Sequence, residues 1–373
     1  MKHNKFILTV LVLCQLNVLM AQNNLPAWSF GPFIRPEKVN PIIVPNPNSF
    51  FIDPMTNKKI AWEANDVFNP AAVVKDNKIF VVYRSEDRSG KGIGERTSRL
   101  GMAESTDGIE MKRNDKPVFY PAKDNQKEFE WTGGCEDPRV AVTEDGTYIM
   151  MYTQWNKKVP RLAVATSKDL VHWIKYGPAF YKAYDGKFKD LATKSASIVT
   201  QVKNGKQVIT KVNGKYMMYW GEHFVNIATS TDLTNWEPMV DEQGELKKII
   251  TPREKYFDSD LTECGPPAVI TNDGILLLYN GKNKSGEESD KNYTANTYAA
   301  GQVLFDLNDP AKVISRLDKP FFVPSEAFEK SGQYPAGTVF VEGLVYYQQK
   351  WFLYYGCADS SVSVAIFNPQ SKK

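Results

Sequence analysis

The sequence predicts an all-β protein built as a five-bladed β-propeller. Aromatic residues make up 12% of its 373 residues, a bias that favours strands over helical bundles. Five segments share one design, in which a polar or proline-bearing start leads into a strand, a turn and an apolar strand that closes on tyrosine. These tyrosines recur every 60 to 76 residues, at Tyr83, Tyr152, Tyr219, Tyr279 and Tyr355. A period of this size, with no helical periodicity competing with it, indicates sheets repeated around an axis.

The first 21 residues are typical of an export signal. Lys2, His3 and Lys5 precede an apolar run over residues 6–14, and Ala21 offers a small residue before a cleavage point. The run is too short to cross a bilayer. We therefore expect a signal peptide over 1–21 and a mature chain that is periplasmic or secreted. Residues 22–65, rich in proline and asparagine, are expected to form an N-terminal arm that wraps a single catalytic propeller domain over 66–373.

The repeated segments predict the two inner strands of each blade. They span Phe68–Arg84, Glu136–Tyr152, Lys194–Trp220, Glu263–Asn280 and Val339–Gly356. Turn pairs that favour positive φ, such as Asp76-Asn77 and Asn213-Gly214, separate the paired strands. Related stretches with an Asp-bearing turn supply outer strands, at Leu100–Gly108, Leu162–Trp173 and Val225–Trp236. Each unit is therefore expected to hold four strands.

Composition and charge exclude several function classes. Lys and Arg number 46 and Asp and Glu 43, so the net charge of +3 gives no basis for a nucleic-acid partner or for membrane insertion of the mature chain. The sequence holds only three histidines, and the cysteines beyond the leader stand far apart. We therefore expect no metal site and no cofactor, and small buried thiols at Cys135, Cys264 and Cys357.

Polar residues that open the inner strands are expected to meet at one end of the propeller axis. The strand starts supply Asn69, Glu136, Asp137, Lys194 and Glu263, and the residues beyond the tyrosine strands supply Arg84, Glu222 and Asp359. Carboxylates predominate in this set, and Arg139 adds a further cation. Two carboxylates around a pocket, without a histidine-based alternative, are what glycoside hydrolysis requires: an acid for the leaving oxygen and a base for water.

Several motifs together resemble glycoside hydrolase family 130 over roughly residues 65–367. The motifs are Gly134-Cys-Glu-Asp-Pro-Arg-Val140, Asn69-Pro70, Tyr83-Arg84, Arg99-Leu-Gly-Met-Ala103, Gly265-Pro-Pro267 and Tyr355-Gly-Cys-Ala-Asp359. The resemblance implies a five-bladed propeller that acts on β-mannosides with inversion, in most members by phosphorolysis. It implies that Asp137 is the proton donor, acting through a hydroxyl of the bound mannose. It also implies that Asn69, Arg84, Arg139 and Asp359 hold the sugar.

The sequence departs from the phosphorylases of that family where they hold phosphate. Those enzymes carry a His-Arg pair and a Tyr-His-Gly motif, whereas this chain has Glu222-His223 and Tyr279-Asn280-Gly281. A carboxylate about 4 Å from phosphate costs about 4 kcal/mol per charge pair at an effective dielectric of about 20. Glu222 and Glu263 resemble the glutamate pair of the family's β-1,2-mannosidase branch. We therefore expect an exo-acting, inverting hydrolase that releases mannose from β-1,2-linked mannosides.

Other interpretations stay open at this point. An inverting phosphorylase that yields mannose 1-phosphate would use His223 and Lys194 for phosphate, and a non-catalytic glycan-binding propeller would need no acid at Asp137. Glu136 is either a sugar ligand or a support for its neighbours, and with Lys194 we count it among the substrate-binding residues. The sequence does not decide which of Glu222 and Glu263 is the base, nor the oligomeric state.

Overall fold

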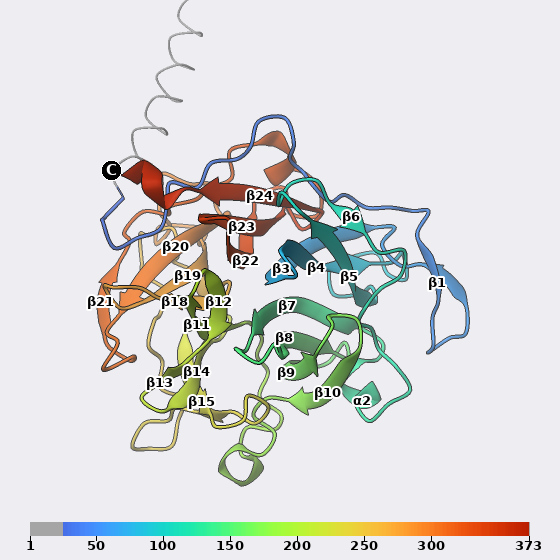
Figure 1. Cartoon of the computed structure of the whole chain (residues 1–373), viewed down its shortest axis with the longest axis horizontal. Coiled ribbons are helices and arrows are strands. Elements are labelled where there is room, and N and C mark those ends of the chain that lie inside the picture. Colours follow the sequence, from blue (N-terminus) through green and yellow to red (C-terminus); the bar gives the residue numbers. More distant parts are fainter. Residues whose placement is uncertain (1–24, 373) are drawn as a thin grey trace, which may run out of the picture.

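The computed structural model describes residues 25–372, so the expected signal peptide at 1–21 lies outside the described residues. Strands dominate, and they form sheets that curl around a common centre (Figure 1). The helical segments are all short: α2 (Lys127–Glu130), η1 (Ala183–Gly186), η2 (Ala327–Glu329) and η3 (Pro369–Lys372). Within the described chain, no helix is long and apolar enough to cross a membrane.

The first two units are antiparallel meanders that run outward from the centre. Their strands are β3 (Asp66–Lys75), β4 (Lys78–Glu86), β5 (Ser98–Ser105) and β6 (Lys112–Arg113), then β7 (Gly134–Val142), β8 (Tyr148–Trp155), β9 (Pro160–Ser167) and β10 (Trp173–Pro178). Asp76 and Asn77 join β3 to β4 with φ values of 48° and 55°. This is the left-handed turn that the sequence predicts.

The next two units keep this plan but modify their inner strands. They contain β11 (Ala196–Lys203), β12 (Lys206–Ile209), β13 (Lys211–Val212), β14 (Lys215–Trp220), β15 (Asn226–Ser230) and β16 (Glu237–Pro238), then β17 (Leu261–Cys264), β18 (Ala268–Ile270), β19 (Ile275–Lys282), β20 (Tyr298–Phe305) and β21 (Val313–Arg316). A turn at Asn204-Gly205, which the sequence analysis did not predict, folds β12 back along β11. Gly265–Pro267 separates β17 from β18, because proline cannot donate to a sheet ladder.

The last unit combines the two ends of the described chain. It consists of β22 (Val339–Tyr347), β23 (Lys350–Cys357) and β24 (Ser361–Phe367), and the N-terminal segment runs alongside β24 (Figure 1). Ile34 pairs with Ile366 and Ile43 with Val362, both antiparallel. The N-terminal segment therefore occupies the position that an outer strand fills in the first two units. Beyond it, β1 (Phe50–Ile52) and β2 (Lys59–Ala61) form a separate hairpin.

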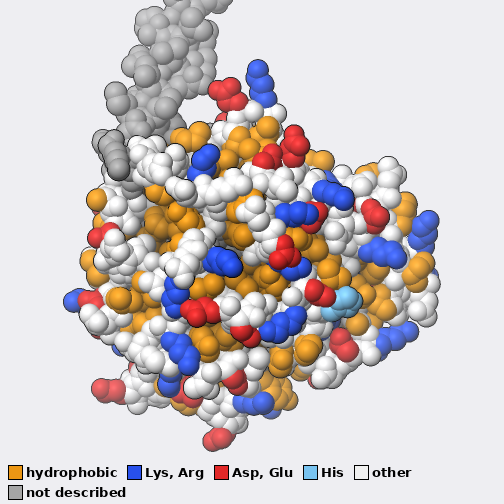
Figure 2. All heavy atoms as spheres, in the orientation of Figure 1, with side chains coloured by type: hydrophobic (Ala, Val, Ile, Leu, Met, Phe, Trp, Pro, Cys, Tyr) orange, Lys and Arg blue, Asp and Glu red, His pale blue; other side chains and the backbone are white. Residues whose placement is uncertain are grey.

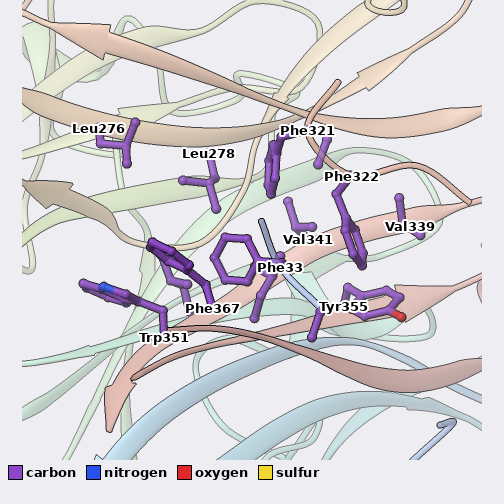
Figure 3. Close-up of a cluster of buried hydrophobic side chains, with 14 of the residues drawn as sticks. Phe33, Leu276, Leu278, Phe321, Phe322, Val339, Val341, Trp351, Tyr355 and Phe367 are labelled. Atoms are coloured by element: carbon purple, nitrogen blue, oxygen red, sulfur yellow. The ribbon is translucent and has the colours of Figure 1, made fainter. Parts of the chain in front are cut away.

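Phe33 shows how the N-terminal segment is fixed to the core (Figure 3). Its side chain is 1% exposed and packs 5.7 Å from the Phe321 ring and 5.6 Å from the Phe367 ring. The same cluster includes Leu278 of β19 and Val341 of β22, so it fills the space between the fourth and last units. Burying one phenylalanine in this way stabilises the fold by roughly 1.5–3 kcal/mol.

All five repeated tyrosines are buried, as expected for core residues, and four of them donate their hydroxyl to a buried carboxylate. The pairs are Tyr83 with Glu63, Tyr152 with Glu130, Tyr279 with Asp258 and Tyr355 with Glu329, at 2.7 to 2.8 Å. Tyr219 differs, because it donates to the backbone carbonyl of Pro310. Buried hydroxyls need partners, and these carboxylates supply them.

Each of these carboxylates also meets a cation, and we call the three-residue sets the tyrosine triads. The ion pairs are Glu63 with Arg113, Glu130 with Lys175, Asp258 with Arg316 and Glu329 with Arg35. Three of the cations lie on the outer strands β6, β10 and β21. Arg35 takes the same place from the N-terminal segment, next to Ile34 and its bridge to β24. The triad pattern thus gives a second reason to regard that segment as an outer strand.

Candidate functional site

Two inner strands bulge at the residues that the sequence analysis selected. The pairing register slips between Phe68 and Pro70, and again between Glu136 and Arg139, which leaves Asn69 and Asp137 out of the ladders. Both adopt left-handed backbone conformations, with φ of 46° and 48°. Bulges re-aim side chains, and non-glycine residues with positive φ concentrate at functional sites. The bulges turn both side chains toward each other.

Asp137 lies at the centre of the site and is 1% exposed. Its Oδ1 accepts hydrogen bonds from Asn69 Nδ2 at 2.8 Å and from Arg84 Nη1 at 3.1 Å. Its Oδ2 has no hydrogen-bond partner in the protein and lies 3.7 Å from Lys194 Nζ. Burial alone would raise the pKa of Asp137, but Arg84, Lys194 and Arg139 outweigh it and hold the pKa well below its usual range. The free protein therefore carries Asp137 as a carboxylate.

Glu136 and Arg84 form the side of the site next to Asp137. Arg84 Nη2 lies 2.9 Å from Glu136 Oε1 and 2.7 Å from Glu86 Oε1, and Arg84 Nε donates to Ser98 Oγ at 3.1 Å. Burial raises the pKa of Glu136 to about 7, and the neighbouring Asp137 carboxylate adds to this increase. Two adjacent buried carboxyls thus have pKa values moved in opposite directions.

Lys194 gathers the remaining carboxylates. Its ammonium lies 3.4 Å from Glu222 Oε1 and 3.9 Å from Glu263 Oε1, in addition to Asp137. Although burial lowers its pKa, Glu263, Glu222 and Asp137 raise the pKa of Lys194 well above its usual value. The shared ammonium limits the distance from Asp137 Oδ2 to Glu222 Oε1 to at most about 7 Å, so of the separations typical of inverting glycosidases, roughly 6.5–9.5 Å, only the shortest fit, and the roughly 5–5.5 Å of retaining enzymes fits as well.

The two glutamates of this group have different surroundings. Glu263 is 1% exposed and accepts a hydrogen bond from Ser195 Oγ at 2.5 Å. Burial raises the pKa of Glu263 to about 7, and the charge of Glu222 raises it further. The side chain of Glu222, which follows β14, is 29% exposed. One carboxyl is thus poised to change its protonation near neutral pH, and the other reaches solvent.

Asp359 and Arg139 differ in how far they are buried. Asp359 is partly exposed, and its burial raises its pKa to about 6, with Arg84, Asp137 and Lys194 close enough to act on it. Gln333 Nε2 donates to the Asp359 carbonyl at 2.8 Å. Arg139 is 2% exposed and donates to the carbonyls of Asp137 and Cys264, both at 3.0 Å. Its guanidinium therefore binds the protein backbone and the neighbouring strands.

The sequence analysis missed several residues of this site. Glu86 pairs with Arg84 and Arg96, and Arg96 also contacts Gln333, which connects the first unit to the loop before β22. Glu342 pairs with Arg139 at 2.7 Å and sits at a bulge of β22, the position that Asn69 and Asp137 hold in β3 and β7. Aligning the repeats residue by residue would have found Glu342, whereas no sequence signal pointed to Gln333.

A large cavity lies away from these carboxylates. A cavity of about 830 Å³ opens at the far ends of the same inner strands, lined by residues such as Val74, Val142, Gln207 and Leu344. None of the carboxylates described above lines it. Hydrophobic side chains dominate its inner-strand walls, whereas the polar residues that the sequence analysis selected lie at the opposite ends of these strands. On the face shown in Figure 2, acidic and basic side chains are interspersed.

The described residues contain no group of three or more His, Cys, Asp or Glu side chains that could hold a metal ion. Cys135, Cys264 and Cys357 are free and buried, as the sequence analysis expects.

Comparisons with known proteins agree on one family. The model of glycoside hydrolase family 130, described as β-1,4-mannooligosaccharide phosphorylase, matches residues 36–370. A 1,2-β-oligomannan phosphorylase of Thermoanaerobacter sp. is 35% identical over 316 residues, which cover 84% of this chain and 93% of the relative. A β-1,2-mannobiose phosphorylase of the same organism is 29% identical and covers 85% of this chain and 94% of its own.

Two solved structures are more similar in sequence. A putative glycosidase from Bacteroides thetaiotaomicron is 66% identical, with a TM-score of 0.92 over 92% of this chain and 99% of its own. A second structure is 63% identical, with a TM-score of 0.92 over 93% of this chain and 96% of its own. It is described with glycoside hydrolases of the family that target β-1,2 mannosidic linkages in Candida mannan. The chain belongs to glycoside hydrolase family 130.

Proposed function

We propose that this protein is an exo-acting, inverting β-1,2-mannosidase that releases mannose from β-1,2-linked mannosides. The observation that carries this proposal is the group of Glu222, Glu263 and Asp137 around the single ammonium of Lys194. We further propose that the curled sheets form a five-bladed propeller over residues 66–373, with 22–65 as its N-terminal arm and the active site at one end of the axis.

The charges around Lys194 favour water over phosphate as the second substrate. A phosphate bound there would compete with three carboxylates for one cation, and each contact of about 4 Å with a carboxylate would cost about 4 kcal/mol at an effective dielectric of about 20. A neutral water meets no such repulsion, and carboxylates accept its protons. The similarity to a structure described with β-1,2-mannoside hydrolases, at 63% identity, supports the same choice.

The proposed mechanism divides the residues between the sugar and the water. Asn69, Arg84 and Asp359 hold the mannose, with Glu136 beside Arg84. Asp137, ionised in the free protein, takes up a proton from solvent as the substrate binds and passes it through a mannose hydroxyl to the leaving oxygen. Glu263 and Glu222 orient the water on the opposite face of the ring, and one of them takes its proton as the C–O bond breaks. Arg139 holds the backbone next to Asp137 and Glu263 through hydrogen bonds to the carbonyls of Asp137 and Cys264.

Product analysis with and without phosphate tests the proposal. Purified protein is incubated with β-1,2-mannobiose in phosphate-free buffer and then with 10-fold steps of added inorganic phosphate, with mannose and mannose 1-phosphate quantified separately. We expect mannose at a rate independent of phosphate. Proton NMR of the first product should show α-mannose, because water attacks from the face opposite the leaving oxygen. Early β-mannose would require a covalent intermediate and contradict the mechanism.

Phosphorolysis is the second candidate, because two relatives at 35% and 29% identity are phosphorylases. In this case His223 and Lys194 would hold the phosphate. Turnover that requires phosphate and yields mannose 1-phosphate would support it, and the hydrolase proposal would then be wrong.

We also propose that the protein is exported and periplasmic or secreted, on the basis of the leader at residues 1–21. N-terminal sequencing of the mature protein tests this. A start at or near Gln22 is expected, and retention of Met1 would contradict export by this signal.

A further inference from the structure

Glu342 is a buried carboxyl of the site for which the proposed mechanism has no role. It lies at the bulge of β22, between Val341 and Gly343, and is fully buried. Its Oε1 forms an ion pair with Arg139 Nη1 at 2.7 Å, and neither carboxylate oxygen receives a hydrogen bond of good geometry from the described residues. Charged groups of this kind are rarely buried unless a specific partner compensates the cost. Arg139 is the cation paired with it, although burial and the charges of Asp137 and Glu263 still raise the pKa of Glu342 well above its usual value.

Arg139 in turn binds the backbone on both sides of the proposed chemistry. Nη1 donates to the carbonyl of Asp137 at 3.0 Å, and Nη2 donates to the carbonyl of Cys264, next to Glu263, also at 3.0 Å. Nε donates to the carbonyl of Gly265 at 3.4 Å. One planar guanidinium thus connects the strand of the proposed acid to the strand of a proposed base, and Glu342 approaches it from a third strand.

The bulge at Asp137 is one reason why the contacts of Arg139 matter for the reaction. Asp137 has φ of 48°, a conformation that a non-glycine residue keeps only when its surroundings enforce it. The hydrogen bond from Arg139 holds the Asp137 carbonyl, and Glu342 fixes the guanidinium that makes this bond. A displacement of about 1 Å at a reacting group can cost about 100-fold in rate. The position of Glu342 therefore bears on rate more than on sugar binding.

We infer that Glu342 is a positioning residue, which sets the places of Asp137 and Glu263 through Arg139. The inference rests on the proposed function for the roles of those two residues. In this assignment Glu342 does not act on the substrate or the water itself. Its effect on the rate depends on a side chain long enough to reach Arg139.

Two conservative variants separate the effect of side-chain length from the effect of charge. A third variant controls for a general loss of stability. Glu342→Gln keeps an oxygen at the same reach, whereas Glu342→Asp withdraws the carboxylate by one methylene group. Glu130→Asp makes the same withdrawal in a tyrosine triad, where Glu130 is equally buried and lies 2.5 Å from Lys175. Steady-state kcat and KM on β-1,2-mannobiose and thermal melting are measured for all three variants and the parent protein.

We expect kcat to fall at least about 100-fold in Glu342→Asp and less than about 10-fold in Glu342→Gln, with KM changed less than about 3-fold in both. Glu130→Asp should lower Tm but keep kcat within about 3-fold. Equal kcat losses in Glu342→Asp and Glu130→Asp, or parental kcat in Glu342→Asp, would overturn the inference.

The phosphate dependence of the parent protein tests the proposed function separately. If the parent turns over mannobiose only with phosphate, the hydrolase proposal fails, but Asp137 still serves as the acid and the same variants still test Glu342. If Glu342→Asp does not fold, a crystal structure of Glu342→Gln decides. Arg139 and the Asp137 bulge should keep their places there, and an Arg139 turned away at parental kcat would contradict the inference.

Discussion

Each tyrosine triad brings one carboxylate to a tyrosine hydroxyl and at least one cation, whereas around Lys194 three carboxylates share one ammonium. Both regions contain buried carboxylates and both hold their charges within about 4 Å, so ion pairing alone does not distinguish them. The balance of charge does. A balanced set stabilises the fold, and a surplus of carboxylates leaves groups free to exchange protons with a substrate.

Replacing the acid should give the largest effect on activity. Asp137→Asn removes the proposed proton donor while keeping a side chain of the same size, so kcat should fall by up to about 10,000-fold. Because Arg84, Lys194 and Arg139 hold the pKa of Asp137 well below its usual range, its charge stabilises the folded state, and Asp137→Asn should also lower Tm at neutral pH. Initial rates and calorimetry check both parts. A kcat close to that of the parent would remove Asp137 from the acid role.

The two glutamates near Lys194 should behave alike in direction. We expect Glu222→Gln and Glu263→Gln each to lower kcat about 100- to 1,000-fold with little change in affinity, since each loses a base or a water acceptor. Added azide, a small nucleophile, should restore activity in the variant that lacks the true base. Near-parental rates in both variants, without phosphate, would contradict the hydrolase mechanism.

A triad carboxylate should show the reverse pattern. Glu130→Gln leaves Lys175 without its closest partner, so the free energy of unfolding should fall by about 3 kcal/mol. At temperatures well below Tm, kcat should stay within about 3-fold of the parent. Denaturant titration and initial rates measure the two quantities. A kcat loss as large as that of the Glu222 variant would remove the distinction between the regions.

The pH dependence sharpens the comparison at Glu263. Its pKa of about 7 predicts that kcat/KM rises with pH up to about 7 if Glu263 is the base, and that Glu263→Gln loses this limb. Stability changes in the opposite direction. The folded state keeps a proton that the unfolded chain has lost between its ordinary pKa and 7, so this group's contribution to stability falls as pH rises through that window. Glu263→Gln should therefore raise Tm more at pH 8 than at pH 5.

The smallest expected effect concerns Tyr219, the repeated tyrosine whose hydroxyl donates to a backbone carbonyl. Tyr279→Phe removes a hydrogen bond to a charged carboxylate and should cost about 2 kcal/mol of unfolding free energy. Tyr219→Phe removes a bond to a neutral carbonyl and should cost about 1 kcal/mol. Urea titrations of both variants resolve a difference of this size. Equal losses would show that the carboxylate adds nothing to the hydrogen bond.

Sequence analysis predicted the all-β class and most inner strands, because tyrosine-closed segments and Asp-Asn or Asn-Gly turns are local signals. It also selected Asn69, Asp137 and Lys194, which the structure brings together. It did not predict the carboxylates of the triads, because residues such as Glu130 lie in the segments that precede the inner strands and meet their tyrosines only after folding. The pairing of Arg139 with Glu342 was missed for the same reason, since it joins positions about 200 residues apart.

The pairing of Ile34 with Ile366 also constrains how the chain reaches its native state. During synthesis the N-terminal segment emerges first, and it waits for nearly the whole remaining chain before its partner strand exists. The last unit is thus the latest to close, and a deletion that removes either Ile34 or Ile366 would open the same sheet. Joining the two ends with a short linker and opening a surface turn elsewhere should give a permuted chain whose last unit forms without that wait.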